Sequence, residues 1–273
     1  MQRTLFTDDH ESFRALVRDV VANEVVPHYA EWEKAGRAPR SFFELLGSLG
    51  LLGTAVPEEY GGAGLPDYRY NVVLQEEASR ALVTLGTVRT QLDVVLPYFL
   101  AYADEEQRRR WFPGLASGKL LTAIAMTEPG TGSDLAGIRT SAVRDGDCYV
   151  LDGAKTFITG GLLADLVIVV ARTASDPGDR RSGLTLLVVE DGMPGFTRGR
   201  VLDKMGIRTQ DTVELAFDSG QCCADCINGF AVKYLDSTAS RGQPRRMVPR
   251  RSDSLLPPTC ATPVAGVLRA PVV

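Results

Sequence analysis

Apolar residues recur every three or four positions along the first 119 residues, which predicts helices. Thr7 and Asp8 can cap the start of the first helix, and Pro27 is expected to end it. Its apolar stripe consists of Phe13, Leu16, Val17, Val20 and Val21. The pattern therefore predicts an amphipathic helix near the N-terminus, with one side buried.

Signals for further helices follow before residue 120. Ser41-x-x-Glu44 reads as a capping box, and Gly50 supplies a stop. Asp104-x-x-Gln107 opens a further short helix in the same way. The apolar positions of the helices between them are Phe42, Leu45, Leu46 and Leu49, then Tyr70, Val73 and Leu74, then Leu92, Val95, Leu96 and Phe99. Residues 1–119 are therefore predicted to form a helical bundle domain.

From residue 120 the pattern changes to that of strands. Asp145-Gly146 separates two β-rich runs at 140–143 and 148–151, which is a strong hairpin signal. Further β-rich runs lie at 166–170, 184–189 and 213–217, between clusters of Gly, Pro, Asp and Ser. Residues 120–219 are therefore predicted to form a β domain, a small barrel or sandwich, so that the fold class is α+β.

The character of the chain changes again after Ser219. Residues 220–273 contain six prolines, six arginines and no glutamate, and neither a period of 3.6 nor a period of 2 persists in them. Four of the five cysteines lie there, namely Cys222, Cys223, Cys226 and Cys260. This segment is predicted to be an irregular, disordered tail.

Composition is that of an ordinary globular protein. The 273 residues suffice for about two domains, and 44% of them are hydrophobic and 23% charged. A formal net charge of −4 leaves no basic footprint for nucleic acid. The N-terminus lacks the apolar stretch of a signal peptide, and the longest apolar run, at 166–171, is far too short to span a bilayer. We expect a cytoplasmic protein that binds no nucleic acid and has no membrane span.

Two segments of the β region carry the candidate chemistry. The first, MTEPGTGSD at 126–134, contains Gly130 and Gly132, which allow a tight turn. Its amides and the hydroxyls of Thr127 and Ser133 can face a polar ligand at close range. The second, FITGG at 157–161, offers an aromatic ring and a hydroxyl at the end of a strand. Together the two segments indicate a flavin site.

These segments resemble the signatures of the acyl-CoA dehydrogenase family, which read approximately T-E-P-x-A-G-S-D and W-I-T-N-G. Further matches are VPEEYGGAG at 56–64, the stretch at 105–118 and KMGIR at 204–208, so that the resemblance covers about residues 5–219. The chain departs from the family at Thr131, Phe157, Gly160 and Gln210, where Ala, Trp, Asn and Ser are usual. The resemblance implies a β domain between two helical domains.

The activity that the resemblance implies is oxidation of an acyl-CoA thioester by bound FAD, in fatty-acid or related acyl-CoA metabolism. A carboxylate base removes the α proton, and the β hydrogen leaves as a hydride to the flavin. Expected partners are the acyl-CoA substrate and an electron-transfer flavoprotein or another acceptor. Family members are usually homo- or hetero-tetramers.

The resemblance also implies roles for particular residues. Residues that would line the flavin and its pyrophosphate are Ile124, Ala125, Met126, Thr127, Gly132 and Ser133. The Thr127 hydroxyl and the Met126 backbone would lie near the pyrimidine side, and Ser133 would also face the pantetheine arm of acyl-CoA. Phe157 would pack on the ring system, with Ile158 and Thr159 near its N5 atom.

The catalytic base of the family is a glutamate in the second helical domain, beyond the point where this chain departs from the pattern. No residue here inherits that role, so no catalytic residue is assigned and ordinary turnover is not expected. The role of Glu128, inside the flavin loop, is architectural in the family. The C-terminal domain is interpreted as missing or frameshifted. The chain is therefore either an impaired acyl-CoA dehydrogenase, a non-catalytic fragment, or a flavin monooxygenase of the same fold.

Two other motifs carry less weight. Gly130-x-Gly132 with Gly137 does not have the spacing of a dinucleotide fingerprint, and no strand-helix-strand unit surrounds it. Cys223-x-x-Cys226 has the spacing of zinc ligands, but both histidines of the chain lie far away in the N-terminal helical region. No metal site is predicted.

Overall fold

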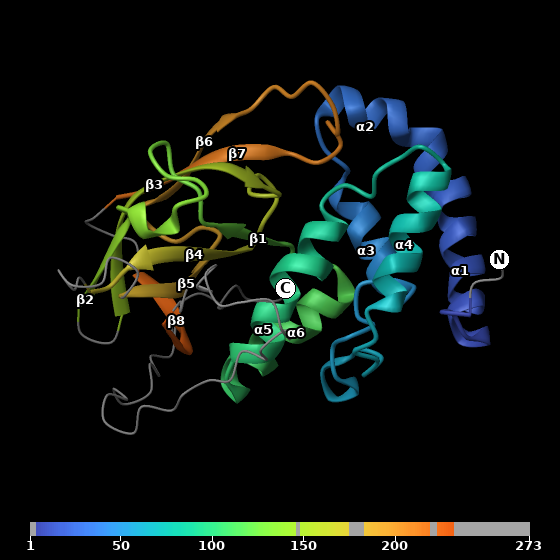
Figure 1. Ribbon diagram of the computed structural model, residues 1–273, viewed down its shortest axis with the longest axis horizontal. Coiled ribbons are helices and arrows are strands. Elements are labelled where there is room, and N and C mark those ends of the chain that lie inside the picture. Colours follow the sequence, from blue (N-terminus) through green and yellow to red (C-terminus); the bar gives the residue numbers. More distant parts are fainter. Residues whose placement is uncertain (1–3, 146–147, 175–182, 219–222, 232–273) are drawn as a thin grey trace, which may run out of the picture.

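Helices come first along the chain, and a curled β-sheet follows beside them (Figure 1). The computed structural model describes residues 4–145, 148–174, 183–218 and 223–231. The helices are α1 (Asp8–Val20), η1 (Val21–Val25), η2 (Val26–His28), α2 (Tyr29–Ala35), α3 (Arg40–Ser48), η3 (Glu58–Tyr60), α4 (Arg69–Arg80), η4 (Thr90–Val95), α5 (Leu96–Tyr102) and α6 (Glu105–Ser117). The predicted succession of a helical domain and a β domain is confirmed.

The first helix continues past the proline that was expected to end it. Thr7 is the N-cap residue of α1, as predicted. The chain then runs through the π-helical turn η1 and the 3-10 turn η2 into α2, with Pro27 in the first turn of η2. The expected end at Pro27 was wrong, because a proline in a first turn removes only an N–H that has no partner there. The helical run ends at Gly36, whose φ is 73°.

Capping boxes were predicted at the starts of α3 and α6, and only the one at α6 forms. Helix α3 begins before Ser41, with an extended Pro39 as its N-cap, so the predicted capping box at Ser41 was wrong. Pro39 leads directly into the helix, and the first turn forms before Ser41 can cap it. The capping box of α6 is confirmed, because the N–H of Gln107 donates to Asp104 Oδ1 at 2.9 Å and the N–H of Asp104 donates to Gln107 Oε1 at 3.1 Å.

The described strands form one curled sheet in the order β1-β4-β5-β8-β3-β7-β6, with β2 paired to β3 and β4. They are β1 (Thr122–Ala125), β2 (Ser141–Asp145), β3 (Cys148–Thr159), β4 (Leu166–Arg172), β5 (Leu184–Glu190), β6 (Phe196–Val201), β7 (Thr212–Phe217) and β8 (Cys223–Ala231). The predicted hairpin is confirmed, since Asp145 and Cys148 pair across β2 and β3. Strands β1 and β4 are parallel, and the neighbours of β3 are all antiparallel to it.

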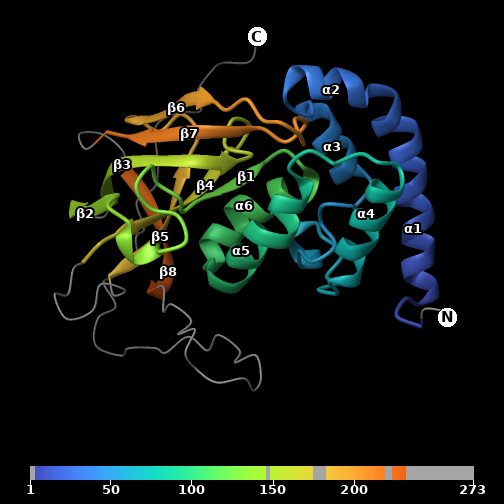
Figure 2. The same ribbon diagram turned by 45° about the horizontal axis from the view of Figure 1, so that its top comes forward.

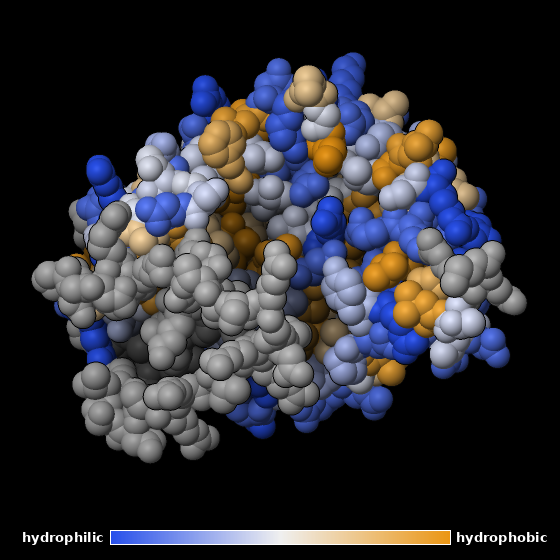
Figure 3. Space-filling model, viewed as in Figure 1, coloured by the Kyte–Doolittle hydropathy of each residue, from blue (hydrophilic) through white to orange (hydrophobic). Residues whose placement is uncertain are grey.

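The sheet is buried on both faces around β4. Ile168 and Val170 join the apolar cluster that continues into the helices, whereas Val167 and Val169 join a second cluster inside the curl of the sheet. This two-sided burial explains why β4 reads as a continuous apolar run and not as an alternating one. The helices η4 and α5 lie against β1 and β8 (Figure 2). On the face shown in Figure 3, some hydrophobic residues lie recessed between the sheet and the helices.

A charged contact joins α3 to the sheet. Arg40 pairs with Asp165, and its guanidinium also donates to the Leu163 carbonyl at 3.1 Å. The second oxygen of Asp165 accepts the N–H of Leu121 at 2.7 Å. Burial raises the pKa of Asp165. The contact fixes the chain just before β1 and β4, ahead of the segment at 126–134 and shortly after the segment at 157–161.

One strand lies in the segment that was predicted to be irregular. Residues Cys223–Ala231 form β8, which pairs with β3 and β5. Main-chain hydrogen bonds to a neighbouring strand require no alternating side-chain pattern, so no periodicity indicated β8. The prediction of an irregular tail for 232–273 concerns chain outside the described residues.

Candidate functional site

The first candidate segment leaves the end of β1 and turns back at once. The N–H of Glu128 donates to the Thr131 carbonyl at 2.8 Å, and the N–H of Thr131 donates to the Glu128 carbonyl at 3.1 Å. The predicted tight turn is therefore confirmed. Neither Gly130 nor Gly132 has a positive φ, and a Cβ added at either position would meet no protein atom within 4 Å. The backbone at these glycines is open to a ligand.

The second candidate segment lies at a bulge near the end of β3. The register between β3 and β7 shifts between Lys155 and Ile158. Inside this bulge Phe157 has a φ of 58°, a left-handed conformation that costs a bulky residue on the order of 1–3 kcal/mol. Its side chain is 66% exposed. The bulge thus presents an aromatic ring at the surface of the sheet at the expense of backbone strain.

The structure brings the two segments together. The N–H of Thr156 donates to the Thr127 carbonyl at 2.9 Å, so that β3 pairs with the loop at the point where it leaves the register of β7. The Lys155 ammonium donates to the Met126 carbonyl at 3.0 Å. Residues about 30 positions apart in sequence are therefore joined side by side through these two hydrogen bonds.

The nine predicted flavin residues differ in what they can present. The side chains of Ala125 and Ile158 are buried in the sheet cluster, so that only their backbone groups can face a ligand. The partly buried members of the set are Ile124, Met126, Thr127 and Thr159, and the exposed members are Gly132, Ser133 and Phe157. The two segments thus expose hydroxyls, open glycine backbone and one aromatic ring.

A buried ion pair lies behind this surface. Lys155 Nζ is 2.9 Å from Glu128 Oε1, and the side-chain exposures are 0% and 7%. The same carboxylate accepts the N–H groups of Arg139 at 2.8 Å and Thr140 at 2.9 Å. Burial alone would raise the pKa of Glu128, but its hydrogen bonds with Thr140, Arg139 and Lys155 hold that pKa below its usual value. The architectural reading of Glu128 agrees with these contacts.

Sequence reasoning missed Lys155. A signal existed, because in β3 the alternation that buries Leu151 also assigns residue 155 to the inner face. A lysine at an inner position of a strand requires a buried acceptor, since an unpaired buried ammonium is very costly. Its two acceptors lie 27 and 29 residues earlier in the chain, where no local pattern reveals them.

The loop between β6 and β7 supports the far end of the site. The Asp211 carbonyl accepts the N–H of Gly160 at 3.0 Å, and its carboxylate accepts the N–H of Leu162 at 2.8 Å. Gly160 has a φ of 77°, which suits glycine and explains why an asparagine can stand there in relatives. Gln210, another of the four positions that depart from the family pattern, donates to Thr90 Oγ1 in η4 at 3.2 Å. These contacts hold the turn that follows Thr159.

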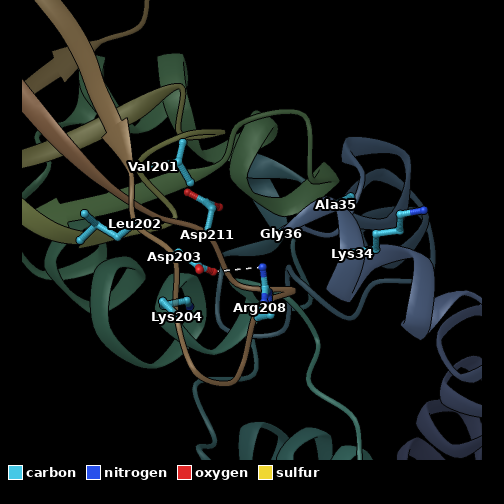
Figure 4. A pocket seen from close by; sticks show the side chains of 9 residues that line it. All are labelled: Lys34, Ala35, Gly36, Val201, Leu202, Asp203, Lys204, Arg208 and Asp211. Carbon is cyan, nitrogen blue, oxygen red and sulfur yellow. Dashed lines mark ion pairs between the residues drawn. The ribbon is translucent and has the colours of Figure 1, made fainter.

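A cavity of about 330 Å³ lies between the end of α2 and this loop (Figure 4). Arg208 and Asp203 pair across it at 3.0 Å, and Asp211 lines it from the side of the sheet. None of the nine predicted flavin residues lines this cavity. The cavity and the surface around Thr127 are therefore separate features. Asp211 lines the cavity and also bonds the turn after Thr159.

In the described part of the chain, no three His, Cys, Asp or Glu side chains gather in a way that could hold a metal ion. The side chains of Cys223 and Cys226, which have the spacing of zinc ligands, lie outside the described part. None of the described helices is long and apolar enough to cross a membrane.

Comparison with known proteins assigns the family. A model of the N-terminal domain of acyl-CoA dehydrogenases matches residues 7–119, and a model of their middle domain matches residues 123–219. The chain belongs to the acyl-CoA dehydrogenase family. The long-chain specific acyl-CoA dehydrogenase of Sus scrofa is 44% identical over 227 residues, which are 83% of this chain and 53% of that protein. The chain thus spans about half the length of the curated relatives it matches.

Solved acyl-CoA dehydrogenases share this fold. The enzyme from Geobacillus kaustophilus superposes with a TM-score of 0.77 at 43% identity, over 82% of this chain and 60% of its own. The acyl-CoA dehydrogenase from Bacillus anthracis, solved as a complex with FAD, superposes with a TM-score of 0.72 at 30% identity, over 83% of this chain and 40% of its own.

Proposed function

We propose that this chain supplies the flavin-binding part of an FAD-dependent acyl-CoA dehydrogenase, an oxidoreductase that acts on the CH–CH bond of an acyl-CoA thioester. The observation that carries the proposal is the hydrogen bond from Thr156 to Thr127, which joins the two segments expected to hold the flavin. When bound, FAD supplies the redox chemistry and accepts the β hydrogen of the substrate as a hydride.

The residues present fit FAD. Gly130 and Gly132 leave room for close approach of a ligand to the backbone, because a Cβ at either position would project into open space. The exposed ring of Phe157 offers a face for the isoalloxazine system. In this proposal the hydroxyls of Thr127 and Thr159 bind polar atoms of the flavin, and Ser133 faces the pantetheine arm of the substrate.

Glu128 is unsuited to act as the base. A general base must reach the substrate proton, directly or through one water. The Glu128 carboxylate is 7% exposed and already accepts Lys155 and two backbone N–H groups. In this proposal no residue of this chain serves as the base, which the family resemblance places in the second helical domain. The proposed partners are an acyl-CoA and an electron-transfer flavoprotein or another acceptor, and the proposed location is the cytoplasm.

Titration with FAD tests the proposal. The purified chain is expected to quench flavin fluorescence on binding, and no quenching at high micromolar protein would contradict a flavin site. Thr159→Val removes one hydroxyl from the partly buried end of β3 and is expected to weaken FAD binding about 10-fold. Thr197→Val is the matched control, because Thr197 is exposed on β6, outside the two segments. Equal affinity of the two variants would remove Thr159 from the site.

A further inference from the structure

Lys155 combines complete burial with contacts to the expected flavin loop. Its side chain is 0% exposed, and its ammonium donates to the Met126 carbonyl at 3.0 Å and to Glu128 Oε1 at 2.9 Å. Burial lowers the pKa of Lys155, and the interaction with Glu128 opposes this effect. Because burying a charged lysine is costly, its presence here calls for an explanation other than packing.

Stability alone does not supply that explanation. A buried ion pair can often be replaced by neutral residues of similar volume without loss of stability, because the desolvation of both charges offsets their attraction. The distinctive feature of Lys155 is its second acceptor, the backbone carbonyl of Met126. This contact acts on the peptide group that joins Met126 to Thr127.

The orientation of that peptide follows from its geometry. In a trans peptide the carbonyl and the N–H point in opposite directions, and the structure contains no cis peptide bond among its described residues. Because Lys155 draws the Met126 carbonyl toward the interior of the sheet, the N–H of Thr127 points the other way. A cation on the carbonyl oxygen also polarises the peptide and strengthens its N–H as a donor.

We propose that Lys155 is a positioning residue for flavin binding, which holds the Met126–Thr127 peptide so that the Thr127 N–H donates to the pyrimidine ring of the flavin. Lys155 itself does not touch the cofactor. The inference rests on the proposed function, because the pyrimidine ring is placed beside Thr127 by the family resemblance. It assigns to a buried residue of β3 a role that sequence reasoning did not find.

The test uses a neutral replacement of the whole pair, Glu128→Gln with Lys155→Met, because Lys155→Met alone leaves a buried carboxylate without its cation. A glutamine keeps only one acceptor oxygen for the N–H groups of Arg139 and Thr140, so the double variant is expected to unfold at a lower urea midpoint, and FAD is titrated under conditions where the variant is folded. It is expected to bind FAD about 10-fold more weakly and to shift the visible absorption bands and lower the reduction potential of bound flavin. Wild-type affinity with an unchanged flavin spectrum in the double variant would overturn the proposal.

Arg14→Met controls for loss of stability. Arg14 forms another buried ion pair, 3.0 Å from Glu77, between α1 and α4 and away from the loop. If this variant weakened FAD binding as much as the double variant, the effect would be general destabilisation and the proposal would fail. The expected result is wild-type affinity and spectrum at temperatures where the Arg14 variant is folded.

A measurement on the unaltered chain covers the case in which the double variant does not fold. The amide ¹⁵N–¹H resonance of Thr127 is expected to move downfield when FAD is added, because its N–H gains an acceptor. An unmoved Thr127 resonance on FAD binding would overturn the positioning role and leave the flavin site standing. If the wild-type chain binds no FAD at all, the proposed function fails, and the positioning role fails with it.

Discussion

The backbone N–H of Thr156 reaches the carbonyl of Thr127 across 2.9 Å, between the end of a long strand and a glycine-rich loop. This bond forms where β3 leaves the register of β7, and the same irregularity turns Phe157 outward. One local departure from regular pairing therefore both joins the two segments and exposes the aromatic ring. Backbone strain of this kind is common near binding sites, which supports the proposed place of the flavin beside this bulge.

Gly132→Ala tests the open side of the loop. The added methyl meets no protein atom within 4 Å and the backbone has no positive φ, so the free energy of unfolding is expected to change by no more than about 0.5 kcal/mol, as for ordinary surface substitutions. FAD affinity is expected to fall about 10-fold or more, because the methyl occupies the space proposed for the cofactor. Gly206→Ala, also in open space, is the control and should bind FAD normally. Equal affinities for the two variants would move the cofactor away from Gly132.

Phe157→Gly tests the backbone strain at this position separately from the contribution of the ring to FAD binding. Glycine tolerates the φ of 58° without penalty, and the exposed ring contributes little buried area, so the free energy of unfolding is expected to rise by about 1 kcal/mol. FAD binding is expected to weaken about 3- to 10-fold as the aromatic face is lost. Both properties are measured on the same preparation, by urea unfolding and by fluorescence titration.

Phe157→Ala is the companion variant. It removes the ring but keeps a Cβ in the left-handed conformation, so it is expected to lose FAD affinity without gaining stability. A gain in stability from alanine equal to that from glycine would show that backbone strain is not the cause.

Some features determined by neighbouring residues were predictable from the sequence, whereas the Ser41 capping box and the features determined by distant contacts were not. The hairpin at Asp145 and the capping box at Asp104 follow from local turn and cap chemistry. The passage of the helix through Pro27 depends on how a π-turn and a 3-10 turn succeed one another, which apolar spacing does not encode.

In the candidate site, too, local motifs were visible in the sequence and long-range contacts were not. The loop and the end of β3 are recognisable as motifs, but the positive φ of Phe157 arises from a register shift against β7. The partners of Lys155 are reached only when β3 folds back on the loop after β1. Sequence patterns thus indicated the two segments, and tertiary pairing determined which of their groups face outward.

Asp211→Asn is expected to change how the free energy of unfolding depends on pH. Burial raises the pKa of the Asp211 carboxyl, so the folded chain binds this proton more tightly than the unfolded chain does. The resulting stabilisation is fully present below the unfolded pKa, about 4, and is lost as the pH rises through the folded pKa. The free energy of unfolding of the wild type, relative to the asparagine variant, should therefore decline from pH 4 toward neutrality.

Urea unfolding of both proteins at several pH values between 4 and 7 checks this expectation. The asparagine can still accept the N–H of Leu162 through its side-chain carbonyl, so the turn after Thr159 is retained. Parallel stability curves for the two proteins would mean that Asp211 does not titrate differently in the folded state.

Gly47→Ala tests the packing of α3 on α6. A Cβ at Gly47 would lie 2.1 Å from the backbone carbon and oxygen of Ser117, which cannot move aside without displacing the helix end. Overpacking of this kind costs roughly 1–3 kcal/mol, which outweighs the gain of about 1 kcal/mol that alanine brings within a helix. The urea midpoint is expected to fall, and a variant as stable as the wild type would contradict the close approach of the two helices.

The most direct test of the central claim is amide hydrogen–deuterium exchange of the chain with and without saturating FAD. If residues 124–133 and 157–159 form one flavin surface, peptides from both segments should exchange more slowly with FAD present, while peptides from α1 and α4 should be unchanged. Slower exchange in both segments together is the predicted result. No protection, or protection confined to other parts of the chain, would contradict the account.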